Sequence, residues 1–123
     1  MIDKRKFYIN GEWVNPTISN NLKVINPSNE EACAVISLGD SADTNAAVVA
    51  AKNAFISWGK TSKAERIVLL KKLYEIYKSK WNEMSEAISM EMGAPIDWST
   101  EQQSNTGSNH IKNFIKTLNN FEF

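Results

Sequence analysis

The sequence has almost none of the residues from which disulfides and zinc sites are built. Cys33 and His110 are the only cysteine and the only histidine among 123 residues. A single cysteine forms no internal disulfide and supplies no multi-thiolate metal site. Structural zinc sites are usually made of four Cys or His ligands. We therefore predict no metal-ligating residue in this chain.

An excess of charge of either sign is also missing. Lys plus Arg and Asp plus Glu number 14 each, so the formal net charge is zero. A neutral chain lacks the field that attracts nucleic acid or an anionic membrane surface. We therefore expect no nucleic-acid partner and no membrane partner.

Long apolar runs are absent as well. The N-terminal segment MIDKRKFYINGEW reaches Asn10, Gly11 and Glu12 before any apolar stretch long enough for a signal peptide. No later run approaches the length of a membrane span. The chain is therefore expected to be cytoplasmic, and its 123 residues are enough for one domain and too few for two.

Glycine is present only as single, scattered residues. Phosphate-binding loops need several glycines close together, so that backbone N–H groups can approach the phosphates. The five glycines stand far apart, at positions 11, 39, 59, 93 and 107. No cofactor-binding residue is predicted from them.

The first part of the chain, residues 1–39, has the pattern of short strands. Asn10-Gly11 lies between two β-prone runs in KFYINGEWV, and this dipeptide tolerates the positive φ angles of a two-residue hairpin turn. LKVIN and ACAVISL flank a turn at Pro27-Ser28-Asn29. We predict a hairpin and a second pair of strands.

Residues 40–123 have helical periodicity. A first helix should begin at Ser41 or Asp43 as its N-cap and end at Gly59. Its apolar side chains recur every three or four residues, at Val48, Ala51, Phe55 and Trp58.

A long second helical segment follows. Ser62 stands three residues before Glu65, which is the capping-box spacing. The stripe after it exceeds an ordinary globular helix, so we predict a break between residues 79 and 82 and a stop at Gly93 and Pro95. The stripe consists of Ile67, Leu70, Tyr74, Tyr77, Trp81, Met84 and Ile88.

A last helix is predicted from Asp97 to Leu118. Gly107 weakens its first half by about 1 kcal/mol relative to Ala, but the small Ser and Gly residues there permit close approach by another segment. The second half has an apolar face at Ile111, Phe114, Ile115 and Leu118. The predicted fold class is α+β and helix-rich: strand pairs followed by three or four helices, in a single partial domain over residues 1–123.

Few residues are candidates for chemistry. Cys33 lies among apolar neighbours on a predicted strand and is expected to be a buried structural cysteine. His110 has no evident partner and is expected at the surface, and Glu91 should face solvent in a last helical turn. Helical spacing of the aromatic and Met residues favours a core over nucleotide stacking; these are Trp58, Tyr74, Tyr77, Trp81, Met84 and Met92. No catalytic residue is predicted.

The chain resembles the N-terminal part of the aldehyde dehydrogenase superfamily. The resemblance runs from Phe7 to Phe123 and is carried, in order, by FYINGEWV, VINPSNEE, AAVVAAKNAFISWGKTSKAERIVLLKKLYEIY and EMGAP. It implies the start of an α/β cofactor-binding domain. For the complete enzyme it implies NAD- or NADP-dependent oxidation of an aldehyde to a carboxylic acid, through a cysteine thiohemiacetal, hydride transfer and thioester hydrolysis.

The motifs that carry chemistry in this family do not occur in the sequence. These are the P-W-N-like asparagine, the lysine after it, the glycine pair, the general-base glutamate and the G-Q-x-C cysteine. Cys33 follows Glu31-Ala32, so the nucleophile's role does not transfer to it. The resemblance gives the EMGAP corner only a structural role. The chain is therefore expected to be a fragment or truncated product that is inactive and binds no cofactor by itself.

Two functional interpretations remain open at this point. In the first, the chain is the N-terminal piece of an aldehyde dehydrogenase, and its partner is the remainder of that enzyme. In the second, it is a small non-enzymatic helical module that binds a partner through its apolar stripe. In either case exposed apolar helix faces are expected to promote self-association.

Overall fold

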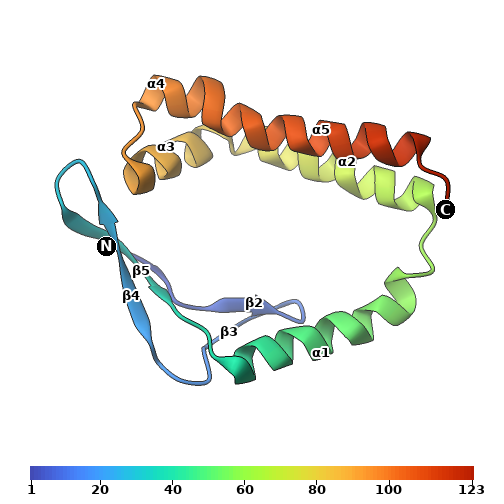
Figure 1. Cartoon of the computed structure of the whole chain (residues 1–123), viewed down its shortest axis with the longest axis horizontal. Coiled ribbons are helices and arrows are strands. Elements are labelled where there is room, and N and C mark those ends of the chain that lie inside the picture. Colours follow the sequence, from blue (N-terminus) through green and yellow to red (C-terminus); the bar gives the residue numbers. More distant parts are fainter. The chain divides into compact units, whose positions relative to one another are not determined.

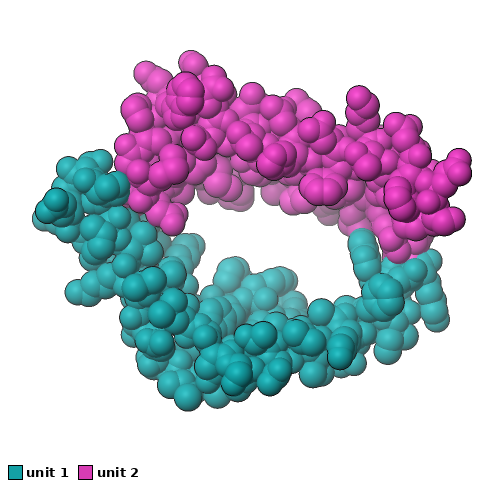
Figure 2. Space-filling view, viewed as in Figure 1, with its two compact units in different colours: residues 1–60 teal, residues 61–123 magenta.

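The computed structural model describes all residues, 1–123, and its contacts divide the chain into two compact units. Unit 1 is Met1–Lys60 and unit 2 is Thr61–Phe123 (Figure 2). The expected change from strands to helices between residues 39 and 40 is confirmed, since β5 ends at Ser37 and α1 begins at Ser41; unit 1 extends to residue 60 because it also includes this first helix. The elements themselves follow the predicted α+β order, with strands first and helices after them (Figure 1).

The predicted hairpin is confirmed in unit 1. Strands β2 (Phe7–Ile9) and β3 (Glu12–Val14) pair antiparallel, and Tyr8 faces Trp13 with ring centroids 5.2 Å apart. Asn10 and Gly11 turn the chain with φ angles of 55° and 82°. Two successive positive φ angles match the right-handed twist of the strands.

The second strand pair is also confirmed, and it belongs to a three-stranded sheet of order β1-β5-β4. Strands β4 (Asn21–Asn26) and β5 (Glu31–Ser37) are antiparallel. Strand β1 (Ile2–Lys4), which was not predicted from the sequence, pairs parallel with β5. Its three residues carry only one apolar side chain, so no periodicity marks them as a strand.

Helix α1 (Ser41–Trp58) begins at a cap one residue earlier than predicted. Asp40 is the N-cap, and its carboxylate accepts hydrogen bonds from the backbone N–H groups of Ala42 and Asp43. Asp43 returns the interaction by accepting from the Asp40 N–H at 3.1 Å. The prediction of Ser41 or Asp43 as N-cap was therefore wrong, because Asp43 occupies the N3 position of this capping box. The C-cap is Gly59, as predicted.

Unit 2 begins with the predicted long, broken helical segment. Helix α2 (Lys63–Ser79) opens on the Ser62–Glu65 capping box, and α3 (Trp81–Met92) follows after Lys80. Lys80 leaves the helical region, with φ −105° and ψ 18°, which confirms the break between residues 79 and 82. Gly93 ends α3 in the left-handed conformation at φ 74°, a geometry that glycine adopts without steric cost.

The last helix is longer and less regular than predicted. It is made of α4 (Ile96–Trp98), a π-helical segment η1 (Ser99–Gln103) and α5 (Ser104–Asn120). The prediction of one α-helix over Asp97–Leu118 missed the π-helical turn, because an i→i+5 bond leaves no periodic sequence signal over so few residues. Within unit 2, α5 lies alongside α2 (Figure 1).

The close approach expected at the small residues is confirmed. The Tyr77 hydroxyl of α2 donates to the Ser104 carbonyl at 2.9 Å, and the Trp81 indole N–H donates to the Thr100 carbonyl at 3.0 Å. A methyl group added at Gly107 would lie 2.5 Å from the Tyr77 hydroxyl oxygen. Gly107 is therefore required at this contact because no larger side chain fits.

The predicted core, in contrast, is not buried. No apolar side chain of the chain is buried, and the residues exposed by less than 2 % are all serines: Ser85, Ser99, Ser104 and Ser108. Tyr77 and Trp81 are half-buried, whereas Met84 is 38 % and Met92 55 % exposed. A single layer of paired helices covers only one side of each helix. The apolar stripe is therefore covered where it faces α5 and exposed elsewhere.

Candidate functional site

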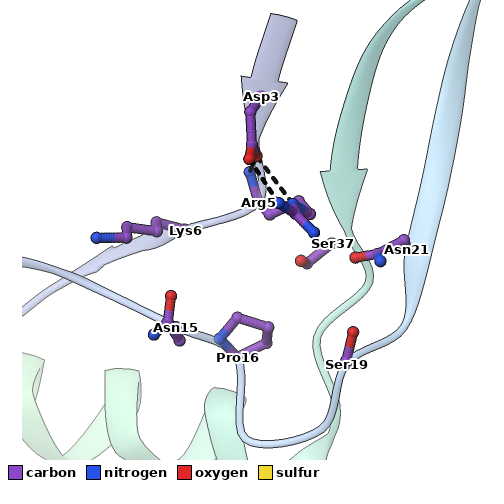
Figure 3. A pocket seen from close by; sticks show the side chains of 8 residues that line it. All are labelled: Asp3, Arg5, Lys6, Asn15, Pro16, Ser19, Asn21 and Ser37. Carbon is purple, nitrogen blue, oxygen red and sulfur yellow. Dashed lines mark hydrogen bonds and ion pairs between the residues drawn. The ribbon is translucent and has the colours of Figure 1, made fainter. Parts of the chain in front are cut away.

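Unit 1 contains a hollow of about 310 Å³ between the end of β1, the end of β5 and the loop after β3 (Figure 3). Most of the side chains around it are polar or charged. They are Asp3, Arg5, Lys6, Asn15, Pro16, Ser19, Asn21 and Ser37. The hollow was not predicted, because its residues come from separate segments of the chain.

The charged edge of the hollow is an ion pair between Arg5 and Asp3. The Arg5 Nε and Nη2 atoms lie 3.0 Å and 2.7 Å from the two carboxylate oxygens of Asp3, a bidentate arrangement. The side-chain hydrogen bonds from Arg5, and then the bond from its backbone N–H, lower the pKa of Asp3 to about 2. Asp3 is therefore ionised at neutral pH and unsuited to act as a general base there.

Ser37 contributes the most deeply placed polar atom of the hollow. The residue is 8 % exposed and its hydroxyl has no hydrogen-bond partner. This oxygen has less than 1 Å² of accessible surface, so it is closed off from the open space of the hollow. The hollow therefore has the positive charges of Arg5 and Lys6 at its edge, but it contains no activated nucleophile.

A second polar cluster joins the loop after β3 to α1. The backbone N–H and the hydroxyl of Thr17 donate to the same Asp43 oxygen at 2.9 Å and 2.8 Å. These bonds, together with the one from the Asp40 N–H, lower the pKa of Asp43. Since both oxygens of this carboxylate accept hydrogen bonds, its role is structural.

The residues singled out from the sequence are not brought together. Cys33 is half-buried rather than buried, because it is the extra residue at the β-bulge in β5, where its thiol donates to the Val24 carbonyl at 3.3 Å. His110 lies exposed on α5 and Glu91 lies exposed in the last turn of α3, as predicted. None of the three has a hydrogen-bonded partner that would make it a nucleophile or a base.

A serine cluster in unit 2 was not predicted as a cluster. The hydroxyls of Ser85 and Ser104 lie 2.8 Å apart, and Ser85 also donates to the Trp81 carbonyl at 2.9 Å. No imidazole or carboxylate is hydrogen-bonded to either hydroxyl. These serines therefore allow α3 and α5 to pack closely and satisfy each other's polar atoms.

The turn between β5 and α1 does not fit the pyrophosphate of a dinucleotide cofactor. Binding of a pyrophosphate at a strand-to-helix turn needs free backbone N–H groups and the positive end of the helix dipole. At the turn between β5 and α1 the Asp40 carboxylate already accepts from the N–H groups of Ala42 and Asp43. Two carboxylates at this helix start would repel a pyrophosphate, so this turn is a cap.

No helix of the chain combines the length and the apolar composition needed to cross a bilayer. No group of three or more His, Cys, Asp or Glu side chains is arranged to hold a metal ion.

Comparison with known proteins gives consistent matches over the whole chain. The model of the aldehyde dehydrogenase family matches residues 13–122. A 3-succinoylsemialdehyde-pyridine dehydrogenase from a Pseudomonas species is 38 % identical over 124 residues, which is 100 % of this chain and 26 % of that protein. A putative aldehyde dehydrogenase of Staphylococcus aureus is also 38 % identical, over 100 % of this chain and 26 % of its own length.

Solved structures agree with these sequence matches. The crystal structure of an aldehyde dehydrogenase from Bartonella henselae superposes with a TM-score of 0.97 at 53 % identity, over 100 % of this chain and 26 % of that one. A mutant aldehyde dehydrogenase C from Pseudomonas syringae, in complex with NAD+ and octanal, superposes with a TM-score of 0.93 at 34 % identity, over 97 % of this chain and 24 % of that one. The chain spans about a quarter of the length of these relatives. On this agreement of sequence and fold, the chain belongs to the aldehyde dehydrogenase family and corresponds to its N-terminal portion.

Proposed function

We propose that this chain acts as the N-terminal part of an NAD-dependent aldehyde dehydrogenase that oxidises an aldehyde to a carboxylic acid. The observation that carries the proposal is the match to the Bartonella henselae enzyme, which extends over the whole of this chain but only 26 % of that enzyme. The nucleophile, the general base and the cofactor contacts are then supplied by the other three quarters of the fold. The part played by these residues is to complete the folded enzyme.

The uncovered apolar surface of α2 supports this role. One face of the helix, with Tyr77, packs against α5. Another row of apolar side chains is bare: Val68 is 65 %, Leu69 48 %, Leu73 49 % and Ile76 47 % exposed. Burial of each such side chain is worth about 1.5–3 kcal/mol. A second apolar face on a helix is normally buried against a further layer of the folded protein. We propose that the remainder of the enzyme forms this layer.

The cofactor and the compartment follow from the same proposal. Two of the similar structures, the Pseudomonas syringae enzyme and a protein called PnpE, were solved with nicotinamide adenine dinucleotide. We therefore favour NAD as the cofactor of the complete enzyme. We place the enzyme in the cytoplasm, because an oxidising compartment favours paired cysteines and this chain has Cys33 alone.

Fragment complementation tests the proposal. The chain is co-expressed with the Bartonella henselae enzyme from which the matching N-terminal quarter has been removed, and NADH formation is followed with octanal as the probe aldehyde. We expect activity only when both pieces are present. Absence of activity from a soluble, co-purifying complex would contradict the proposal.

A pair of matched variants distinguishes the loss of apolar contact at the exposed face of α2 from a general effect of added negative charge. Leu73→Glu places a carboxylate on the bare face and should abolish complementation. Lys71→Glu changes the charge more strongly, at an exposed position two residues away, and should leave the complemented activity within about twofold, as surface substitutions usually do. Equal loss in both variants would mean that the α2 face has no special role.

A further inference from the structure

The π-helical segment η1 changes the backbone hydrogen-bond register of the last helix in unit 2. In an α-helix the Ser104 N–H would donate to the Thr100 carbonyl, four residues earlier. Here it donates to the Ser99 carbonyl, five residues earlier. The Thr100 carbonyl is therefore passed over by the Ser104 N–H and is available to a donor from outside the helix.

This donor is the indole N–H of Trp81, the first residue of α3. Its nitrogen lies 3.0 Å from the Thr100 carbonyl oxygen. Four residues before Trp81, the Tyr77 hydroxyl donates to the Ser104 carbonyl at 2.9 Å, and the two aromatic rings are in edge-to-face contact. Two donors four residues apart thus bind two carbonyls four residues apart. The register of η1 matches the side chains that face it.

The π-helical register also has a cost. Ser99 is 0 % exposed, and its hydroxyl has no hydrogen-bond partner. A buried hydroxyl without a partner destabilises the conformation that contains it. π-Helical turns are rare and occur mostly as single-turn insertions in α-helices, often at functional sites. The segment therefore keeps this register only while contacts from outside the helix offset the cost.

We propose that η1 is a hinge with two backbone registers, and that the Trp81 indole N–H selects the π-helical one. When this donor is withdrawn, the Ser104 N–H returns to the Thr100 carbonyl and the segment closes as an α-helix. Each residue of an α-helix turns the chain by about 100°, so the change rotates α4 and the EMGAP corner by about that angle around the axis of α5. The hinge lies entirely in unit 2 and does not depend on the proposed dehydrogenase activity.

NMR of the full chain tests the register directly, through the scalar coupling that an amide nitrogen shows to the carbonyl carbon that accepts its hydrogen bond. In the original chain the Ser104 amide should couple to Ser99. Trp81→Phe removes the indole N–H and should shift the ratio of the two couplings roughly 5-fold toward Thr100, the size of one lost neutral hydrogen bond. Trp98→Phe makes the same change at a 55 % exposed position on α4 and should leave the ratio unchanged.

A second substitution separates the N–H group from the bulk of the ring. Benzothienylalanine in place of Trp81 keeps a bicyclic ring of nearly the same shape and lacks the N–H, so it should shift the couplings as Trp81→Phe does. The proposal is overturned if this variant behaves like the original chain, because Trp81 would then act through packing alone. It is also overturned if the Ser104 amide stays coupled only to Ser99 in both variants.

Deletion of Glu101, an exposed residue of η1, gives an independent check. The deletion removes the additional residue of the turn, so the helix closes as an α-helix and no carbonyl is passed over. In the original chain Trp81→Phe should speed hydrogen exchange of the amides of residues 100–106 roughly 5-fold. In the deletion background the same substitution should change their exchange by no more than about twofold. Equal acceleration in both backgrounds would contradict the proposal.

Discussion

The contact between Gly107 of α5 and Tyr77 of α2 gives the sharpest prediction about the packing of unit 2. A β-carbon at position 107 would lie 2.5 Å from the Tyr77 hydroxyl oxygen, 2.9 Å from Cζ and 3.3 Å from Cε2. Tyr77 is held by its hydrogen bond to the Ser104 carbonyl and by an edge-to-face contact with Trp81, whose ring centroid is 6.0 Å away. Gly107→Ala must therefore displace a ring that is fixed on two sides.

The change in stability of α5 is the sum of two destabilising contributions and one stabilising contribution. Forcing an additional methyl group into a packed contact costs about 1–3 kcal/mol. Loss of the tyrosine hydrogen bond costs about 0.5–1.5 kcal/mol more. Replacing Gly by Ala within a helix contributes about 1 kcal/mol in the other direction. The net expected destabilisation of α5 is therefore about 2 kcal/mol.

Hydrogen exchange followed by mass spectrometry measures this effect directly, because it reports local opening of each segment. The amides of residues 104–120 should exchange about 30-fold faster in Gly107→Ala, since 1.4 kcal/mol corresponds to a factor of ten. Asn113→Ala, an exposed position on the same helix, is the control and should slow exchange slightly through its higher helix propensity.

The reasoning is refuted if Gly107→Ala slows exchange of these amides, because helix propensity would then be the only effect and the contact with Tyr77 would not exist. A double-mutant cycle adds a second check. Tyr77→Phe removes the atom closest to the new methyl group, so the penalty of Gly107→Ala should be smaller in that background.

Three other predictions concern activity, cofactor binding and pH. The purified chain should oxidise no aldehyde with NAD or NADP, and NADH production that Cys33→Ala abolishes would contradict this. Calorimetric titration with NAD should show no saturable site tighter than about 1 mM, or about −4 kcal/mol; a tighter site would mean that a dinucleotide-binding surface was missed. The pKa of Asp43 lies below its usual 3.8 in the folded chain, chiefly because the Thr17 N–H donates to it. The stabilisation from the ionised carboxylate is thus complete above pH 3.8 and lost as pH falls through the lowered pKa. The first turn of α1 should lose exchange protection in acid, and Asp43→Asn should remove that pH dependence.

Local sequence signals predicted the elements whose stability is local. Asn10-Gly11 specified the hairpin, the Ser62–Glu65 spacing specified the start of α2, and Gly93 specified the end of α3. Each of these signals acts through backbone conformation or hydrogen bonds within a few residues. These signals can therefore be recognised in the sequence without knowledge of the rest of the fold.

The features that the sequence did not reveal depend on contacts between distant residues. Strand β1 exists through parallel pairing with β5, more than 30 residues away, as Ile2 opposite Ala34 shows. The hollow that Arg5 and Ser37 line is assembled in the same way. The predicted core is not buried, for a related reason. Periodicity identifies an apolar face, but it does not say whether the surface that covers that face lies in the same chain.

The central claim is that the apolar faces of this chain are covered by the remainder of an aldehyde dehydrogenase. The most direct test is to measure binding of a hydrophobic dye and light scattering by the purified chain, before and after adding the C-terminal three quarters of the Bartonella henselae enzyme. Exposed apolar patches bind such dyes and promote association. We predict strong dye binding and oligomers for the chain alone, with dye fluorescence falling to a plateau at one equivalent of the added piece. A monodisperse monomer that unfolds in one sharp transition and ignores both the dye and the added piece would contradict the claim.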